Sequence, residues 1–121
     1  MSLTVLTVDD SRTMRDMLRL ALADAGFEVT QAEDGLHGLD VLRQRRPHVI
    51  VTDINMPRMD GFGFISEVRK DTVYQAIPIL VLTTESDAEK KAKARAAGAT
   101  GWIVKPFDPE KLIAAIRRVA A

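Results

Sequence analysis

Short apolar runs rich in β-branched residues alternate along this chain with longer stretches whose apolar residues recur every three or four positions. Most of the runs are apolar almost continuously, which is the pattern of strands covered on both faces in a parallel sheet flanked by helices. Because crossovers between parallel strands are right-handed, the alternation predicts a doubly wound α/β domain with a five-stranded parallel sheet. The predicted strands are residues 3–8, 27–30, 49–52, 77–82 and 102–104.

The helical stretches between these runs carry start and stop signals. The first stretch ends at Gly26, the second runs from about 34 to 45 and stops before Pro47, and the third opens after Asp60-Gly61. The apolar residues within each stretch predict the face that turns toward the sheet. These inward residues are Met14, Met17, Leu18, Ala21, Leu22 and Ala25 in the first stretch, Leu36, Leu39 and Leu42 in the second, and Phe62, Ile65 and Val68 in the third.

The last two helices differ in how firmly they are expected to pack. The fourth is predicted to begin with a capping box, in which Ser86 and Glu89 satisfy free amide donors reciprocally. Its inward stripe is alanine and buries little area, so we expect this helix to be loosely held. The fifth is predicted to have Asp108 as its N-cap and Pro109 at its first position. The predicted inward residues are Ala88, Ala92 and Ala96 in the fourth helix, and Leu112, Ile113, Ile116 and Val119 in the fifth.

Length and composition limit the class of protein. With 121 residues, 46% of them apolar, the chain has the size of one domain with its own core. Its 17 basic and 17 acidic residues balance, so no overall field attracts nucleic acid or a membrane surface. The absence of cysteine excludes disulfides and thiolate chemistry, and no apolar run approaches the length of a membrane span. We expect residues 1–121 to form one soluble, cytoplasmic, monomeric domain without an output domain, because the last helix runs to the end of the chain.

Polar residues follow the predicted strands at the edge where such sheets bind ligands. Asp9 and Asp10 end the first strand, Asp53 the third, Thr83 the fourth and Lys105 the fifth. Taken singly, each has an ordinary structural explanation: a capping turn, an N-cap, a strand-end hydroxyl or a surface lysine. Their convergence on one edge from distant parts of the sequence favours a functional site.

The residue types at this edge suit phosphoryl transfer. Three clustered carboxylates repel one another by roughly 3 kcal/mol per pair at ~5 Å, a cost that a bound cation offsets. Oxygen ligands without histidine or cysteine select a hard ion, and few protein ligands favour Mg²⁺ over Ca²⁺. An aspartate can act as a nucleophile that forms an acyl phosphate, while Lys105 and Thr83 supply charge and a hydrogen bond. No glycine-rich phosphate loop is present, which disfavours nucleotide binding.

Four motifs make the chain resemble the bacterial response-regulator receiver domains, and among them the stand-alone chemotaxis regulators of the CheY type. They are VDDS at residues 8–11, TDINMPRMDG at 52–61, LTTE at 82–85 and VKPF at 104–107. The resemblance covers essentially the whole chain and implies the flavodoxin-like receiver fold. It also implies that Asp53 is the phosphoryl acceptor, that Asp10, Asp53 and the backbone carbonyl of Asn55 ligate Mg²⁺ directly, and that Asp9 acts through water.

The resemblance further implies how the phosphoryl group is held and how its presence is signalled. Lys105 would pair with a phosphoryl oxygen, with a cis Lys105–Pro106 bond aiming its side chain. Thr83 would move toward the phosphoryl group and the aromatic Trp102 would change rotamer. The alternative for Trp102 is that it partly fills a gap between neighbouring elements.

Two residues are implied to act in loss of the phosphoryl group. Asn55 and Glu85 occupy positions where chemotaxis regulators carry the same residue types, and there they help to orient the attacking water. The resemblance thus implies intrinsic Mg²⁺-dependent autophosphorylation and autodephosphorylation in a signalling switch that is not an enzyme acting on external substrates. The alternative for Glu85 is a solvated loop charge.

The partners follow from the same resemblance. The phosphodonor would be a histidine kinase, because His37 lies on a helix and His48 at the entrance of a strand, and neither is near the carboxyl ends of the strands. The target would be the flagellar motor switch, bound through the surface of the fourth helix, fifth strand and fifth helix. The fourth helix also carries a run of basic residues, which would either form a solvated face or steer an acidic partner toward this surface. They are Lys90, Lys91, Lys93 and Arg95.

Three other functions remain open at this stage. A phosphate sink or phosphorelay intermediate would accept phosphate without binding the motor. An aspartyl-nucleophile phosphohydrolase would need a second acid–base aspartate, and Asn55 holds the nearest such place. A flavin-binding module is disfavoured because three carboxylates would repel the FMN phosphate.

Overall fold

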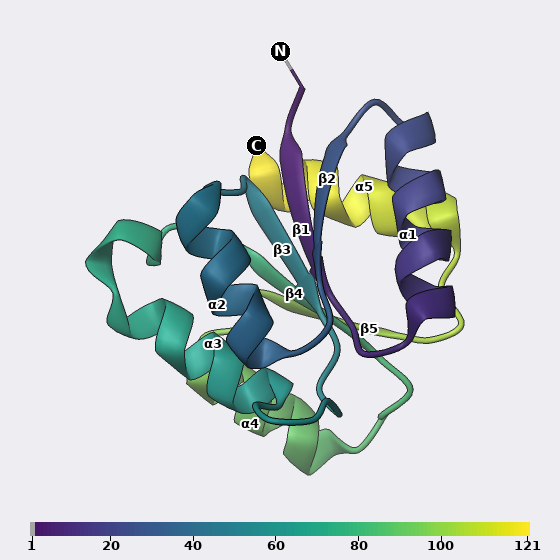
Figure 1. The fold of residues 1–121 in the computed structure, drawn as a ribbon. Helices are drawn as coiled ribbons and strands as arrows, with labels where there is room; N and C mark the ends of the chain where they lie inside the picture. The colour runs from purple at the N-terminus through teal and green to yellow at the C-terminus, as the bar shows by residue number, and fades with distance from the viewer. Residues whose placement is uncertain (1) are drawn as a thin grey trace.

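Five parallel strands form one sheet in the order β2-β1-β3-β4-β5 in the computed structural model, which describes residues 2–121 (Figure 1). This is the flavodoxin-like order, so the predicted fold class is confirmed. The strands are β1 (Thr4–Val8), β2 (Glu28–Ala32), β3 (Val49–Thr52), β4 (Ile79–Thr83) and β5 (Gly101–Val104). The helices are α1 (Arg12–Asp24), α2 (Gly35–Gln44), α3 (Gly61–Lys70), α4 (Ala88–Ala97) and α5 (Pro109–Ala120), with a short 3-10 helix, η1 (Thr72–Tyr74).

The helices cover the sheet in two layers, with α1 and α5 on one face and α2, α3 and α4 on the other (Figure 1). Each layer has its own core. Leu18 and Leu22 of α1 pack with Leu112 and Ile116 of α5 on the first face. On the second face, Phe64 of α3 is fully buried among residues of β1, β3 and β4.

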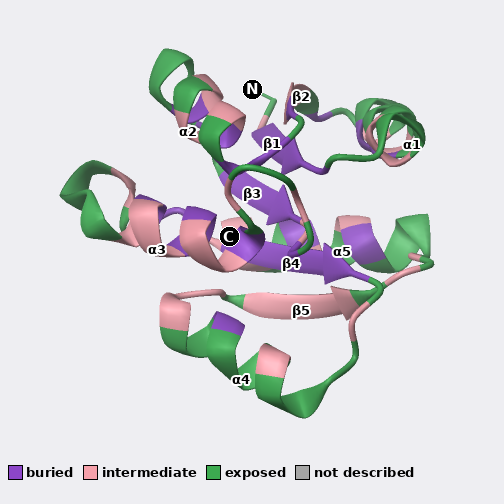
Figure 2. Cartoon of the chain, turned by 60° about the horizontal axis from the view of Figure 1, so that its bottom comes forward, coloured by how far each residue is buried: buried purple, intermediate pink, exposed green. Residues whose placement is uncertain are grey.

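The three central strands are buried throughout, but the two edge strands are not (Figure 2). In β5 the first three residues are half-buried and Val104 is exposed, while β2 is buried only at Ala32. The apolar run at 102–104 therefore belongs to an edge strand that α4 and α5 cover only in part. The predicted coverage on both faces is correct for β1, β3 and β4 alone.

Most of the predicted helix boundaries are confirmed by the caps. Gly26 follows α1 with a φ of 93°, the left-handed conformation that glycine adopts at little cost. Asp34, Asp60 and Asp108 are the N-caps of α2, α3 and α5, and each side chain accepts a hydrogen bond from a backbone amide of the first turn. Pro109 begins α5 as predicted.

The predicted start and inward face of α4 are wrong. The N-cap is Asp87, whose carboxylate accepts a hydrogen bond from the Glu89 amide at 2.7 Å, so Ser86 does not form a capping box. Its buried residue is Ala94, which lies on the opposite side of the helix from the predicted alanine stripe. The three alanines predicted to face inward are exposed: Ala88, Ala92 and Ala96. With one buried alanine, α4 still contributes little apolar burial, as Figure 2 shows.

Two apolar residues predicted to face the core also lie outside it. Met17 of α1 is 50% exposed and Leu36 of α2 is 40% exposed. At α2, Gly35 and Gly38 take the buried positions because they let the helix approach Met59 and Phe64 closely.

Among the described residues, no helix is both long and apolar enough to cross a membrane.

Candidate functional site

The sheet ladder continues past the strand ends and fixes the backbone of the polar residues that follow. The Asp53 amide donates to the Val8 carbonyl at 2.9 Å, and the Lys105 amide donates to the Thr83 carbonyl at 2.8 Å. Since β1 lies between β2 and β3, the strand order reverses beside β1 and β3, where sheets of this kind bind ligands. The residues after β1 and β3 are thus held at the switch point of the sheet.

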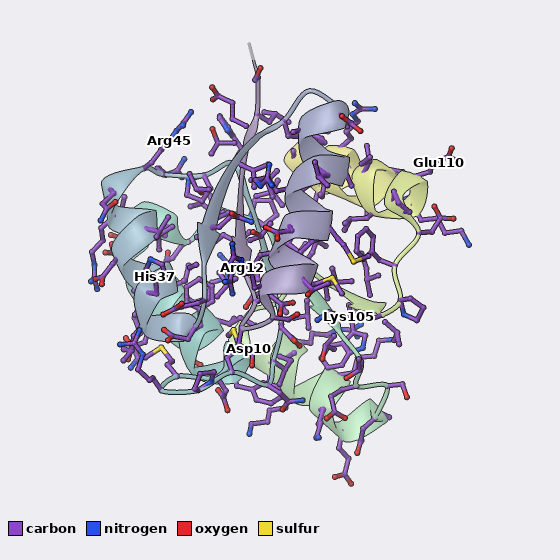
Figure 3. The ribbon with its side chains drawn as sticks, turned by 45° about the vertical axis from the view of Figure 1, so that its right-hand side comes forward. Asp10, Arg12, His37, Arg45, Lys105 and Glu110 are labelled. Carbon is purple, nitrogen blue, oxygen red and sulfur yellow. The ribbon has the colours of Figure 1, made fainter. Side chains whose placement is uncertain are left out.

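Three carboxylates gather at this point. Asp9, Asp10 and Asp53 each offer an oxygen, and these oxygens lie within 4.8 Å of one another. Asp9 is buried at 2% exposure, Asp53 is half-buried and Asp10 is exposed. Figure 3 shows Asp10 and Lys105 at the same end of the sheet, whereas Arg45 lies toward the opposite end.

Lys105 joins two of the three carboxylates. Its Nζ lies 2.8 Å from Oδ2 of Asp9 and 3.0 Å from Oδ2 of Asp53. Burial disfavours the ammonium form, but the hydrogen bonds to Asp9 and Asp53 outweigh it and raise the pKa of Lys105. For Asp9, burial outweighs the hydrogen bond from Lys105 and raises the pKa of its carboxyl group. The Lys105–Pro106 bond is cis.

The oxygen atoms of the cluster differ in their availability to a metal ion. Asp9 uses Oδ1 to accept from the Ser11 amide at 2.9 Å and Oδ2 to accept from Lys105. Asp53 Oδ1 accepts from the Ile54 amide at 2.7 Å. Within residues 2–121, the Asp10 carboxylate has no hydrogen bond or ion pair. An exposed free carboxylate beside two oriented ones, without nitrogen or sulfur donors, fits a hard divalent cation.

The remaining predicted residues lie on the β4 side of this cluster. Thr83 is fully buried, and its Oγ1 accepts a hydrogen bond from the Glu85 amide at 3.4 Å. The Glu85 side chain accepts from Asn55 Nδ2 at 3.1 Å, so the two residues predicted to act together are in contact. Trp102 is half-buried, and its Nε1 donates to the Glu85 carbonyl at 3.1 Å.

The loop between β3 and α3 is shaped by a residue that has to be small. A Cβ atom at Gly61 would overlap the carbonyl oxygen of Asp53, and the Gly61 amide donates to the Ile54 carbonyl at 2.8 Å. The glycine of the DG pair therefore allows α3 to begin directly against the backbone that carries Asp53. Any larger residue would displace that backbone.

The same loop is tied to α2 by an ion pair that the sequence did not reveal. Arg58, with a φ of 64°, donates through Nε to Asp34 Oδ2 at 2.7 Å and through a terminal nitrogen to Oδ1 at 3.0 Å. Asp34 is 2% exposed and also caps α2 through the His37 amide. The Arg58 hydrogen bonds outweigh burial and lower the pKa of the Asp34 carboxyl group.

The Asp34 ion pair is expected to stabilise the protein in a pH-dependent way. Because the folded-state pKa lies below the usual value of 3.8, the unfolded state binds more protons as the pH falls. The stabilisation should be constant above about pH 5 and should decrease progressively below about pH 4. Urea midpoints of the native protein and Asp34→Asn, which keeps a capping side chain but cannot titrate, should converge on acidification. A constant difference from pH 7 to pH 3 would contradict this.

Sequence reasoning missed two ion pairs around the site and correctly left two histidines aside. Arg58 pairs with Asp34, and Lys90 of α4 lies 3.0 Å from Glu85. No residue spacing indicates either pair. His37 and His48 use Nδ1 to accept hydrogen bonds from the backbone amides of Glu33 and Thr4, respectively. Both histidines therefore have structural partners.

The fold and the strand-end residues define a class of signalling domain in which an acidic cluster and a lysine meet at the sheet's switch point. The family model of the response regulator receiver domain matches residues 5–117, and the chain belongs to this family. It is accordingly the receiver domain of a two-component response regulator, in which phosphorylation carries the signal.

The chain resembles solved structures and curated proteins of this family. It shares 48% identity with the chemotaxis protein CheY4 of Vibrio cholerae, over 98% of this chain and 99% of that one, with a TM-score of 0.94. A response regulator from Chloroflexus aurantiacus, at 32% identity, covers 99% of this chain and 98% of its own with a TM-score of 0.94. The response regulator MprA of Mycobacterium bovis is 38% identical over 97% of this chain and 50% of its own length. The chain spans about half the length of the curated relatives it matches.

Proposed function

We propose that this chain is a phosphorylation switch whose acceptor is Asp53 and whose phosphodonor is a histidine kinase. The observation that carries the proposal is the meeting of Lys105 Nζ with Asp9 and Asp53 beside the free carboxylate of Asp10. This arrangement holds one carboxylate next to positive charge at an accessible edge, as phosphoryl transfer requires.

The chain's own residues supply the parts of the transfer step. A carboxylate oxygen of Asp53 forms a bond to phosphorus while the phosphorus–nitrogen bond of the donor histidine breaks and its electron pair stays on the imidazole. Lys105 then pairs with a phosphoryl oxygen. A Mg²⁺ ion held by Asp10, Asp53 and the Asn55 carbonyl, with Asp9 acting through water, would neutralise phosphoryl charge.

The signal leaves the site through the loop after β4. The Thr83 hydroxyl turns toward the phosphoryl group and gives up its hydrogen bond with the Glu85 amide. Trp102 responds because its indole is bonded to the carbonyl of the same loop residue. The small apolar burial of α4 leaves this region free to rearrange at low cost.

We propose that the target is the flagellar motor switch protein, as the resemblance to chemotaxis regulators implies, and that it binds the surface of α4, β5 and α5. Trp102 and Ile103 of β5 line a hollow of about 340 Å³ together with Ala115 and Arg118 of α5. Exposed basic residues on α4 border the same strand and favour an acidic partner segment. A phosphate sink would lack this binding, so comparing motor-switch affinity with and without an acyl-phosphate mimic separates the two functions.

Incubation with acetyl phosphate and Mg²⁺ is expected to add one phosphoryl group, at Asp53. Intact-mass analysis should show a single addition of phosphate to the native protein, and peptide mapping after reduction with borohydride should place it on Asp53. Asp53→Asn should remain unmodified. Phosphate on any other residue, or on Asp53→Asn to the same extent, would contradict the proposed acceptor.

A further inference from the structure

Glu85 is the point where four elements meet beside the acceptor. Its Oε1 accepts a hydrogen bond from Asn55 Nδ2 at 3.1 Å and forms an ion pair with Lys90 Nζ at 3.0 Å. Its carbonyl accepts from Trp102, and its amide donates to Thr83. Lys90 is the residue through which α4 contacts Glu85. Neither the phosphoryl-transfer step nor binding of the partner requires this contact.

Lys90 differs from the other basic residues of α4. It is half-buried and lies against the Glu85 carboxylate, whose side chain is 27% exposed. Lys91 and Arg95 are exposed, and Lys93 lies over the Phe62 ring at 4.3 Å. Within residues 2–121, Lys90 alone among these four forms an ion pair with an acidic side chain. The basic run therefore contains one residue with a defined partner at the site.

Phosphorylation changes the electrostatic setting of Glu85. A phosphoryl group on Asp53 adds negative charge at the end of β3, and that charge repels a carboxylate held beside Asn55. The positive charge of Lys90 opposes this repulsion and also restrains the carboxylate oxygen that Asn55 contacts.

We propose that Lys90 is a positioning residue that keeps Glu85 beside Asn55 while Asp53 is phosphorylated, and thereby shortens the lifetime of the phosphoryl group. This inference rests on the proposed function of Asp53. In the hydrolysis step, a water oxygen bonds to phosphorus, the bond from phosphorus to the Asp53 oxygen breaks, and its electron pair returns to the carboxylate. Both protons of the water leave with the product as dihydrogen phosphate. Glu85 accepts a hydrogen bond from that water and aims its oxygen.

The lifetime of the phosphoprotein tests the role of Lys90. Each protein is phosphorylated with acetyl phosphate and Mg²⁺, the donor is removed rapidly, and the remaining phosphoprotein is quantified by intact mass at timed intervals. Lys90→Met should slow the loss by up to about fivefold, the range that a partly exposed ion pair can account for. Lys90→Arg, which keeps the charge, should restore most of the native rate. The matched control Lys70→Met, which removes a lysine paired with Glu67 on α3 and not with Glu85, should decay at the native rate.

A double substitution separates positioning from a general effect on folding. In a Glu85→Ala background, which itself should slow the loss, Lys90→Met should cause no further change because its target is gone. The rate of phosphorylation by acetyl phosphate and the urea midpoint should be the same in Lys90→Met and Lys70→Met, because each loses one exposed ion pair. Unchanged or faster loss in Lys90→Met, or slowing that adds to that of Glu85→Ala, would overturn the inference while leaving Asp53 as acceptor. Failure of the native protein to take up phosphate on Asp53 would overturn both.

Discussion

Replacing Lys105 by methionine is expected to lower the free energy of unfolding by about 3 kcal/mol in metal-free buffer. The ammonium group lies between two carboxylates, its side chain is 9% exposed, and Asp9 beside it is 2% exposed. Removing one partner of a buried ion pair leaves the other charge uncompensated, and here two further carboxylates lie within 4.8 Å. Urea unfolding with chelator present measures the loss directly.

The control for this substitution is Lys111→Met, which removes an exposed lysine from α5. It should change the unfolding free energy by less than about 0.5 kcal/mol, because surface substitutions away from special features have small effects. Equal stability of Lys105→Met and the native protein would show that Asp9 does not depend on the ammonium group for its charge balance.

Magnesium is expected to stabilise the native protein, and Asp10→Asn should lose most of that gain. A ligand that binds only the folded state adds about 2.7 kcal/mol at a hundredfold excess over its Kd. Asp10 carries the free carboxylate of the cluster, so its substitution removes the ligand with the fewest competing contacts. Without metal, Asp10→Asn should be more stable than the native protein by about 1 kcal/mol, since it relieves repulsion at an exposed position where solvent screens it.

Thermal unfolding over a Mg²⁺ titration measures both effects in the same samples. Asp24→Asn, which removes an acidic side chain from the exposed end of α1, should respond to Mg²⁺ as the native protein does. Equal gains in Asp10→Asn and the native protein would place the metal elsewhere. A metal-free Asp10→Asn that is less stable than the native protein would argue against repulsion within the cluster.

The order of elements and the positions of the strand-end residues were predictable because both depend on short-range sequence signals. Continuous apolar runs mark the central strands, and Asp9, Asp53 and Lys105 follow such runs directly. Parallel strands then bring their carboxyl ends to one edge whatever the loops do. The helix starts at Asp34, Asp60 and Asp108 also depend on local signals, because each side chain accepts a hydrogen bond from an amide two or three residues further on.

The errors arose where local signals competed or were weak. Ser86 and Asp87 are both good N-caps, and the structure uses Asp87. The alanine spacing of α4 offers more than one apolar face, and the sheet contacts the face that carries Ala94 instead of the predicted one. At α2, glycines occupy the buried positions because Phe64 and Met59 fill the space, so apolar spacing pointed to Leu36 instead. The run that forms β5 gave no indication that it is an edge strand.

The sequence by itself determined the fold class, the strand-end carboxylates and the lysine, because these depend on residue type and on the geometry common to parallel sheets. Only the tertiary structure decided which charges touch. Lys105 joins Asp9 to Asp53, Arg58 holds Asp34, and Lys90 reaches Glu85. The physical reason is that a side-chain contact depends on backbone positions to within about an ångström, and those positions follow from loop conformation and the packing of whole helices, which residue spacing does not encode.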